Sequence, residues 1–291
     1  MIPILDFCNE YHGHQPSFLN SIADEIRQHK KRIVWLAGDS SLDNKFWISN
    51  RAAPVNVYET ILTKGTIPMD VAYHLNKIFI DSGEEFVCIN CAVEESTLAS
   101  RRHRLLSHDT VIQEKIKPGD VLIISVGGND IALSPSFSTI ASLMAVITLA
   151  SNESIVNGVA IGMGHLLSLF NDDTQNYIQR IVSKCNGGIH IIVCMIYYPA
   201  IELSHSWADT ALAALGYDCN PQRLQLLIKS AYEHGTLKIK IPNCTVTGCP
   251  LYEVLDPRNQ EDYEARVEPS DTGGSKMARS FFDLIKKNNC K

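Results

Sequence analysis

Five short apolar runs recur along the chain, and stretches with helical spacing separate them. The runs are rich in Val, Ile and Cys and cover residues 32–37, 85–91, 120–126, 190–197 and 244–252. Continuous apolar character, without alternation of polar positions, is typical of parallel strands that are buried on both faces. The runs therefore predict a parallel sheet of five strands.

Helical periodicity fills the intervals between these runs. Apolar residues recur at helical spacing in two intervals, and a third helix is expected to start at an Asn-Pro cap and to end near Gly235. The residues concerned are Leu19, Ile22, Ala23 and Ile26, then Val71, Leu75, Ile78 and Phe79, then Asn220 and Pro221 followed by Leu224, Leu227, Ile228, Ala231 and Tyr232. Strands that alternate with helices predict a three-layer α/β/α sandwich, and the lack of a linker or repeat predicts one domain over residues 1–291.

One stretch departs from this alternation because it is almost free of charge. Between Ile131 and Asn171 the only formally charged residue is Glu153. Its apolar run, 140–150, is short of the roughly 20 residues that cross a bilayer, so no stable membrane span is predicted. We expect a pair of helices that are buried or face a second copy of the chain, which predicts self-association through residues 131–171. The alternatives are a wall or lid of a substrate pocket and contact with a membrane surface.

Composition limits the classes of function. Of the 291 residues, 45% are hydrophobic and 20% are charged, as in an ordinary globular protein. The net charge of −6 gives no electrostatic reason to expect nucleic acid as a partner. Residues 1–15 lack a basic start followed by an apolar core, so no secretory signal is predicted. We therefore expect a cytoplasmic location with reduced cysteines.

Candidate chemistry lies in the loops that follow the strands, since sites in parallel α/β sheets form outside the carboxyl ends of the strands. The first loop, residues 38–44 (GDSSLDN), carries Ser40, which is expected at the N-terminus of a helix. Such a terminus stabilises a developing negative charge. The third loop, residues 127–130 (GGND), carries Asn129, whose amide can donate to an oxyanion. Either loop alone is equally well a turn with a capping residue, but the two together are much more specific.

These two loops resemble blocks of the SGNH, or GDSL-type, hydrolases, a family of flavodoxin-like serine esterases and lipases. Residues 38–43 are similar to the first block, with Ser40 at the position of the nucleophile. Residues 127–130 are similar to the third block, with Asn129 at the position of the oxyanion-binding asparagine. The resemblance implies a flavodoxin-like SGNH fold and attack by Ser40 on an ester or similar acyl bond. It also implies that Asp39, Gly128 and Asp130 line the substrate site.

The second block is matched only in part. Residues 90–98 resemble the family's Asn-Ala-Gly-x-x-Gly-x-Thr loop, but Ala92 and Glu95 stand where glycines are usual. A backbone N–H donor does not require glycine. The resemblance therefore still implies that the Glu95 amide contributes to the oxyanion hole.

The fourth block breaks the match. The family normally ends with Asp-x-x-His-Pro, in which the aspartate orients a histidine that deprotonates the serine. In residues 265–269 (ARVEP), Glu268 takes the place of the histidine and Ala265 that of the aspartate. A serine hydroxyl is a poor nucleophile without an adjacent base, so the catalytic competence of the chain depends on what replaces the histidine.

Three explanations are open. In the first, Glu268 is itself the base; burial must then raise its pKa from about 4.3, and a nearby cation such as Arg266 or Arg51 would prevent this. In the second, His205, which follows the fourth strand, reaches the serine. In the third, the fold has lost its hydrolase activity and keeps a ligand pocket. The leading prediction is an ester hydrolase that uses Ser40, and the alternative is an inactive protein that binds a small acyl ester or related ligand.

No metal or cofactor is predicted. The ten histidines include neither His-x-x-x-His nor HExxH, and no GxGxxG motif follows the first strand. Cys88 and Cys91 have the spacing of metal ligands. Residues three apart on a strand point to opposite faces of the sheet, however, so the two thiols are expected in the core.

Overall fold

Five parallel strands form the central sheet in the computed structural model, which describes residues 1–202 and 206–289. They are β1 (Arg32–Gly38), β4 (Phe86–Asn90), β5 (Val121–Ser125), β6 (His190–Met195) and β7 (Thr245–Pro250). Their order across the sheet is β4-β1-β5-β6-β7. Numbered along the chain this is 2-1-3-4-5, the flavodoxin-like order. The predicted parallel sheet of five strands is confirmed.

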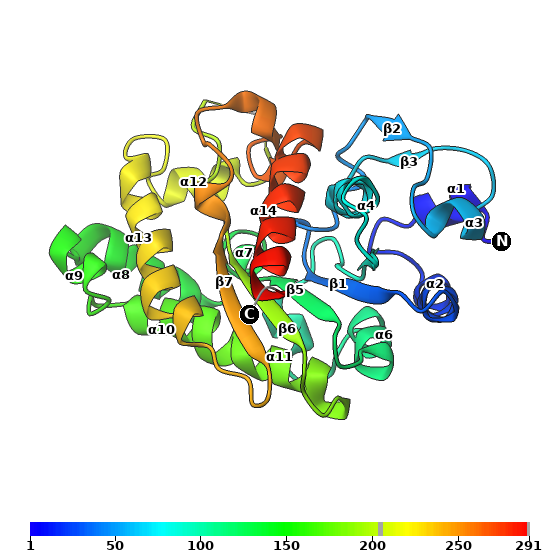
Figure 1. Cartoon of the computed structure of the whole chain (residues 1–291). Helices are drawn as coiled ribbons and strands as arrows, with labels where there is room; N and C mark the ends of the chain where they lie inside the picture. The colour runs from blue at the N-terminus through cyan, green and yellow to red at the C-terminus, as the bar shows by residue number, and fades with distance from the viewer. Residues whose placement is uncertain (203–205, 290–291) are drawn as a thin grey trace.

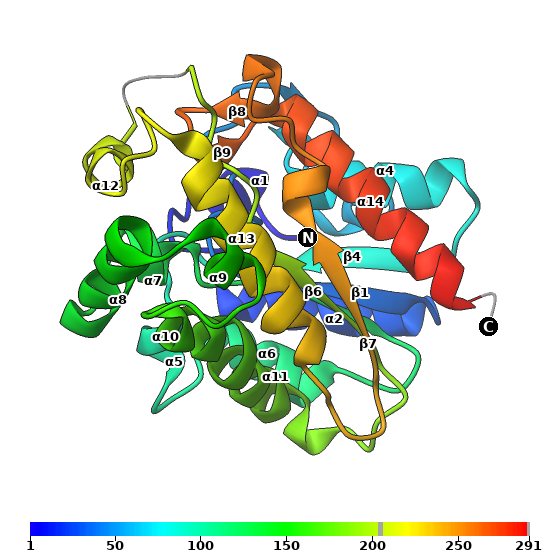
Figure 2. The same ribbon diagram turned by 90° about the vertical axis from the view of Figure 1, so that its left-hand side faces the viewer.

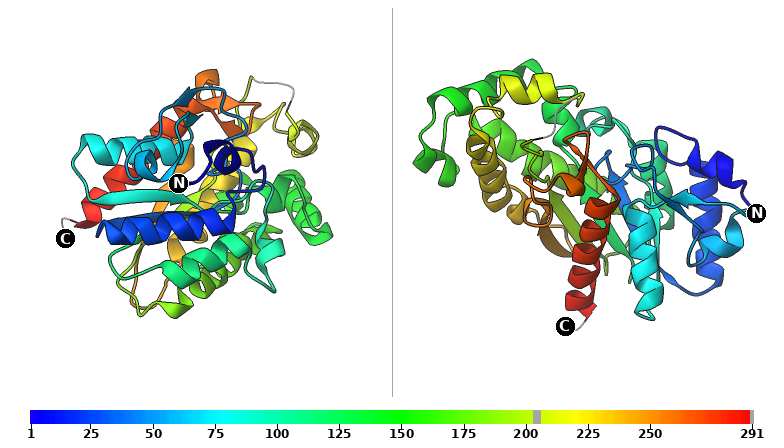
Figure 3. Two further views of the ribbon diagram at one scale, coloured as in Figure 1. Left: turned by 90° about the vertical axis from the view of Figure 1, so that its right-hand side faces the viewer. Right: turned by 90° about the horizontal axis from the view of Figure 1, so that it is seen from above.

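Helices cover both faces of the sheet and give the predicted three layers (Figures 1 and 3). Helices α4 (Val71–Asp81) and α14 (Asp271–Asn289) pack against each other on one face. The core of the other face is built with α2 (Pro16–Gln28), α6 (Ser107–Lys115), α11 (Thr174–Ile181) and α13 (Pro221–His234). The predicted α/β/α sandwich is therefore confirmed.

Successive residues of each strand point into different cores. In β1, Ile33 and Trp35 belong to the core that contains α2, whereas Val34 and Leu36 belong to the core that contains α4 and α14. All four side chains are fully buried. Burial on both faces is the reason that the strands are continuous apolar runs rather than alternating ones.

The three helices predicted from periodicity are α2, α4 and α13. Helix α13 begins at Pro221 and ends before Gly235, as expected. Asn220 occupies the cap position, but its side chain accepts no capping hydrogen bond. The helix therefore starts where predicted, without the predicted side-chain cap.

The remaining elements are short and lie around the edges of the sheet. Two small antiparallel pairs join β2 to β3 and β8 to β9. These elements are β2 (Arg51–Ala52), β3 (Ile67–Pro68), β8 (Tyr263–Glu264), β9 (Glu268–Pro269), α1 (Ile4–Cys8), α3 (Tyr58–Ile61), α5 (Leu98–Arg101), α7 (Gly128–Ala132), α8 (Phe137–Leu149), α9 (Asn152–Val156), α10 (Met163–Ser168), α12 (Asp209–Ala214) and the single turns η1 (Leu169–Asp173), η2 (Val182–Lys184), η3 (Thr236–Lys238), η4 (Leu251–Glu253) and η5 (Gln260–Asp262).

The nearly uncharged segment 131–171 forms the 13-residue helix α8 and the short helices α9 and α10 rather than the expected pair. Figure 2 shows them beside α13 on one side of the molecule. Leu143 and Val146 are buried there, whereas Val159 and Ile161 are each 73% exposed. The apolar run 140–150 lies almost entirely within α8, and glycines and serines after it separate α9 and α10 from that helix. Self-association through this segment stays a prediction.

Within the described part of the chain, no helix has both the length and the apolar character that a membrane crossing requires.

Candidate active site

The loops that carry Ser40 and Asn129 start side by side, at the point where the strand order reverses between β1 and β5. Two glycines make this close approach feasible. A Cβ atom on Gly38 would lie 1.8 Å from the Ser125 carbonyl oxygen, so no other residue fits there. Gly127 has a left-handed φ of +101°, and a Cβ atom there would meet the Phe170 ring at 2.7 Å.

Ser40 lies in a single turn and not at the start of a helix, so that expectation is wrong. The backbone N–H groups of Leu42 and Asp43 both donate to the Asp39 carbonyl oxygen, and the chain then leaves the turn. The Asp39 carboxylate accepts from the Ser41 hydroxyl at 2.7 Å and from the Ser41 N–H at 3.2 Å. These side-chain bonds favour a closed turn over helical continuation.

Glu268 and Ser40 are in contact, although 228 residues separate them. The Ser40 hydroxyl donates to Glu268 Oε1 at 3.4 Å, and the indole N–H of Trp207 donates to the same oxygen at 3.1 Å. Glu268 pairs with Glu264 across the β8–β9 ribbon. The turn between these strands contains Ala265 and Arg266, which have left-handed φ values of +41° and +74°. The residue that replaces the expected histidine is thus presented directly to Ser40.

Both cations that would have neutralised Glu268 lie elsewhere. Arg266 forms ion pairs with Asp209 and Asp218, at the opposite side of its turn. Arg51 is exposed and binds the Thr66 carbonyl oxygen at 2.8 Å. Neither guanidinium group therefore stabilises the ionised form of Glu268.

Burial accordingly dominates the acid–base chemistry of the site. Burial, then the neighbouring Glu94 and Asp39 carboxyl groups, raise the pKa of Glu268 well above its usual value. Burial also raises the pKa of Glu94 to about 8 and that of Asp39 to about 6. Burial therefore favours the neutral, protonated form of both Glu268 and Glu94.

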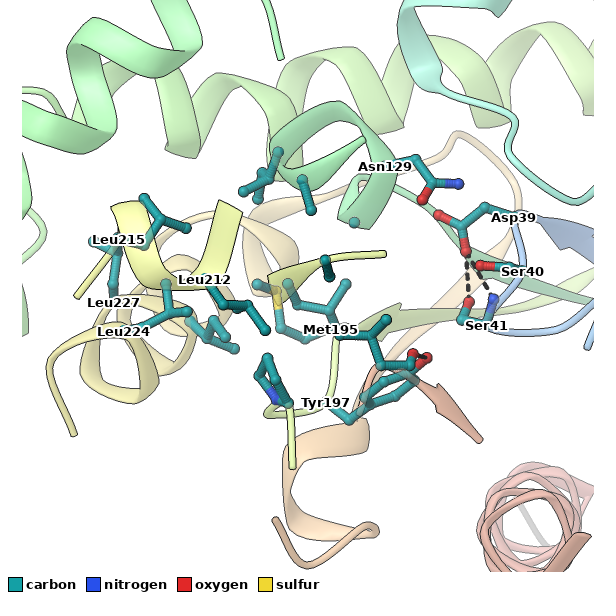
Figure 4. Close-up of a pocket in the computed structure, with 18 of the residues that line it drawn as sticks. Asp39, Ser40, Ser41, Asn129, Met195, Tyr197, Leu212, Leu215, Leu224 and Leu227 are labelled. Atoms are coloured by element: carbon teal, nitrogen blue, oxygen red, sulfur yellow. Dashed lines mark hydrogen bonds between the residues drawn. The ribbon is translucent and has the colours of Figure 1, made fainter. Parts of the chain in front are cut away.

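An apolar cavity of about 100 Å³ opens beside these acids. In Figure 4, Asp39, Ser40, Ser41 and Asn129 gather at one end, whereas leucines of α12, α13 and the segment between them gather at the other. Those leucines are Leu212, Leu215, Leu224 and Leu227. Leu143, Leu166 and Phe170 of the uncharged segment also line the cavity. Part of that segment is therefore a pocket wall, one of the alternatives considered for it.

The other predicted site residues differ in their placement. Asn129 and Gly128 line the cavity, and Asn129 donates one amide N–H to the Ser96 carbonyl oxygen at 3.1 Å. An asparagine amide has two such hydrogens, so one is left for another acceptor. Asp130 does not line the cavity, because its carboxylate binds the Leu98 and Ala99 N–H groups and thereby caps α5.

Glu95 has an exposed side chain and a left-handed φ of +61°, the conformation expected where the family has glycine. The contribution of its amide to an oxyanion hole stays a prediction. His205 lies outside the described residues.

Sequence reasoning missed three residues of the site. Trp207 holds Glu268, and Trp47 holds Glu94 by an indole N–H bond of 3.3 Å to Glu94 Oε1. The signal for Glu94 was present in the sequence, since two glutamates occupy the second loop and only Glu95 matched a motif position. Nothing in the sequence marks either tryptophan as a carboxylate ligand.

No metal site was found in residues 1–202 and 206–289, where His, Cys, Asp and Glu side chains nowhere form a group of three that could hold an ion. Cys88 and Cys91 are fully buried in the two different cores of the sheet.

Comparison with known proteins gives matches of structure only. No protein-family model matches this chain, and neither does any curated protein sequence. A psychrotrophic esterase from Pseudoalteromonas sp. is similar at 11% identity and a TM-score of 0.47, covering 89% of this chain and 100% of the esterase. An acetylxylan esterase from Geobacillus stearothermophilus is similar at 16% identity and a TM-score of 0.43 (87% and 94% covered). A family 3 carbohydrate esterase from Clostridium thermocellum has 13% identity and a TM-score of 0.43 (88% and 98%). Likeness at this level carries no argument about chemistry, which rests on the geometry of this chain.

Proposed function

We propose that this chain hydrolyses a carboxylic ester, with Ser40 as nucleophile and Glu268 as general base. The observation that carries the proposal is the contact between Ser40 Oγ and Glu268 Oε1, 3.4 Å long, at the polar end of an apolar cavity. The proposal makes the chain a divergent SGNH-type hydrolase, in keeping with its blocks at residues 38–43 and 127–130.

Acylation begins when ionised Glu268 takes the hydroxyl proton of Ser40. Ser40 Oγ then forms a bond to the acyl carbon, and the carbonyl oxygen becomes an oxyanion. The oxyanion is assigned to the remaining Asn129 amide hydrogen and to the backbone N–H groups of Ser40 and Glu95. When the tetrahedral intermediate collapses, the bond to the alcohol breaks, and the alcohol leaves with the proton held by Glu268.

Deacylation repeats these steps with water. Glu268 takes a proton from a water molecule whose oxygen attacks the acyl carbon, the bond to Ser40 breaks, and Ser40 Oγ recovers the proton. The products are a carboxylic acid and an alcohol. The apolar side chains of the cavity bind the acyl group throughout, because they remove its apolar surface from water.

The raised pKa of Glu268 gives this base its strength and limits its range. A carboxylate of ordinary pKa is too weak to deprotonate serine effectively, and catalytic efficiency is best when the pKa of the base lies near the working pH. Hydrolysis of a neutral ester should therefore increase from neutral to alkaline pH as Glu268 ionises.

The test is covalent labelling with a fluorophosphonate, read by mass spectrometry at pH 6 to 9. We expect an adduct on Ser40 whose rate of formation rises with pH, no adduct in Ser40→Ala, and strongly slowed labelling in Glu268→Gln. Glu261→Gln is the matched control, because Glu261 is exposed and lies seven residues from Glu268 in the chain. Absence of an adduct in the folded wild-type protein at every pH would overturn the proposal.

One observation favours a second candidate, a binding protein without turnover. The same burial that strengthens Glu268 also favours its protonated form, and a neutral acid cannot activate a serine. Saturable binding of an acyl ester, with no labelling and no hydrolysis across the pH range, would support this candidate.

A further inference from the structure

Two buried glutamates near Ser40 are held in the same way. Glu268 is 1% exposed and Glu94 is 4% exposed. In each, Oε1 accepts from a tryptophan indole N–H, Trp207 for Glu268 and Trp47 for Glu94. In each, Oε2 is buried and has no hydrogen-bond partner among the described residues. Buried polar atoms are rarely left without a partner, so two such oxygens in one site call for a ligand that supplies the missing interaction.

Most of the described groups that face these glutamates are acids or phenols, and the contact of His12 with Glu94 is to the backbone, with Nδ1 3.3 Å from the carbonyl oxygen. Asp39 comes from the loop after β1, Tyr197 from the end of β6, and Tyr11 from the N-terminal segment. Lys45 lowers the pKa of Glu94, but its ammonium group is bound to Asp43 Oδ1 at 2.6 Å and lies over the Phe46 ring. Burial, followed by Glu94, Glu95 and Glu268, raises the pKa of Tyr11 to about 12, so its phenol is neutral as well.

We propose that the ester which this chain hydrolyses carries a permanent positive charge in its alcohol, and that Glu94 and Glu268 bind that charge. This inference rests on the proposed function, since it names the substrate class of the same site. The apolar part of the cavity takes the acyl group, which leaves the polar end, lined by Asp39, Ser40 and Glu268, for the alcohol. Glu94 does not line this cavity and acts as an electrostatic neighbour of Glu268.

The surroundings fit an organic cation better than a metal ion. No group of three or more metal-ligating side chains occurs among the described residues, so a metal would lack a complete set of ligands. Aromatic rings accompany the acids instead. Trp47 and Trp207 touch them, and Tyr11 packs edge to face on Phe46 with 5.3 Å between ring centroids. Aromatic rings beside a negative charge are a common environment of a bound quaternary ammonium group.

A bound cation would also shift Glu268 toward its ionised form, at the expense of some of its strength as a base. Opposite charge within a few ångströms favours the ionised form of a carboxyl group, so binding would lower the pKa of Glu94 and Glu268 and release protons. The ionised fraction of Glu268 would then be larger with a cationic substrate bound than without one. Cationic esters should therefore be hydrolysed at lower pH than neutral esters of the same shape.

Calorimetry on the Ser40→Ala protein tests this directly, because the ester is not consumed. The probes are butyrylcholine and the ester in which carbon replaces its quaternary nitrogen. At pH 7 we expect the cationic ester to bind at least about tenfold more tightly, with proton release that appears as a dependence of the binding heat on the buffer. Adding Glu94→Gln should remove the preference, and adding the control Glu261→Gln should leave it unchanged.

Equal affinity for the two esters would overturn the inference, as would binding of the cationic ester without proton release. The second outcome is measured with Glu94 and Glu268 intact, so it does not depend on whether Glu94→Gln folds. Failure of the proposed function is distinguishable. If the chain prefers the cationic ester but hydrolyses no ester, the proposed function fails and the ligand class holds. If it hydrolyses both esters and binds them with equal affinity, the proposed function holds and the ligand class fails.

Discussion

Asp120 and Glu268 are buried carboxyl groups at opposite ends of the sheet, each 1% exposed and each bound to a tryptophan indole, yet their surroundings differ. Asp120, at the amino end of β5, is fully satisfied. It accepts from the Ile33 N–H at 3.0 Å, the Lys117 N–H at 3.0 Å and the Trp35 indole at 3.1 Å, and it forms an ion pair with Arg27. Among the described residues, Glu268, at the carboxyl end, has two donors and no cation as an ion-pair partner.

This difference in surroundings indicates that Asp120 contributes to the stability of the fold, whereas Glu268 can take part in acid–base chemistry. A buried carboxyl group that has a cation and several donors connects the elements around it. A buried carboxyl group without a cation can take up and release a proton near neutral pH. Asp43 with Lys45 and Asp109 with Arg101 are of the first kind, and Glu94 is of the second.

Replacement of the two carboxyl groups should therefore have opposite effects, and the largest is on turnover. Glu268→Gln keeps the size of the side chain but removes the base. We expect the hydrolysis rate to fall about a thousandfold at pH 8.5, while the free energy of unfolding stays the same or increases. Steady-state kinetics with a chromogenic short-chain ester and urea unfolding measure the two quantities. If Glu268→Gln unfolded more easily but kept its turnover, the contrast with Asp120 would be wrong.

Asp120→Asn should show the reverse pattern. It leaves Arg27 without its partner and places an amide opposite two backbone N–H donors and an indole. Breaking one member of a buried pair costs about 4 kcal/mol of unfolding free energy. The hydrolysis rate per folded molecule, measured at low temperature, should stay within about twofold of the wild type. A loss of turnover in molecules that remain folded would contradict the assignment of Asp120 to stability alone.

The third prediction concerns Glu94 and the pH dependence of stability. Its pKa of about 8 in the folded protein exceeds the usual value near 4.5, so the folded state binds this proton more tightly than the unfolded chain does. The associated stability is fully present below pH 4.5 and is lost as the pH rises through about 8. Glu94→Gln should therefore be more stable than the wild type by about 3 kcal/mol at pH 9, with a much smaller difference at pH 4.5.

Urea unfolding at the two pH values measures this difference, with Glu261→Gln as a control that should show no pH-dependent gain. An equal effect of Glu94→Gln at both pH values would mean that Glu94 does not titrate in this range. The burial of an unpaired acid at the site would then have no energetic cost, and the comparison with Asp120 would lose its basis.

The sheet, its three layers and the position of the site were predictable from the sequence, because they follow from local patterns. Runs such as 120–126 are apolar throughout since both faces of β5 are covered. Ser40 and Asn129 follow directly after strands, and parallel topology brings such loops to one edge of the sheet. The helix expected at Ser40 was wrong because the side chain of Asp39 competes for the N–H groups of the turn.

The electrostatic environment of Glu268 was not predictable in the same way. Whether a carboxyl group can act as a base depends on which cations lie near it in space, and these come from distant parts of the chain. Arg266 is two residues from Glu268 but points to Asp209 and Asp218. Glu94 and Trp207 are remote in sequence and lie at the site. Sequence proximity therefore suggested the wrong neighbours for this residue.

The smallest expected effects come from a matched pair of substitutions, Trp35→Phe and Trp207→Phe, which each remove one indole donor from a buried carboxyl group. At Asp120 the lost hydrogen bond and the smaller ring should cost about 2 kcal/mol of unfolding free energy, with no change in the pH profile of hydrolysis.

At Glu268 the lost donor raises the pKa of the base, since the Trp207 bond lowers it. The ascending limb of the pH–rate profile, where Glu268 ionises, should shift to higher pH by about one unit. A shifted pH–rate profile in Trp35→Phe would contradict a purely structural role for Trp35. An unshifted profile in Trp207→Phe would contradict the effect of Trp207 on the pKa of Glu268.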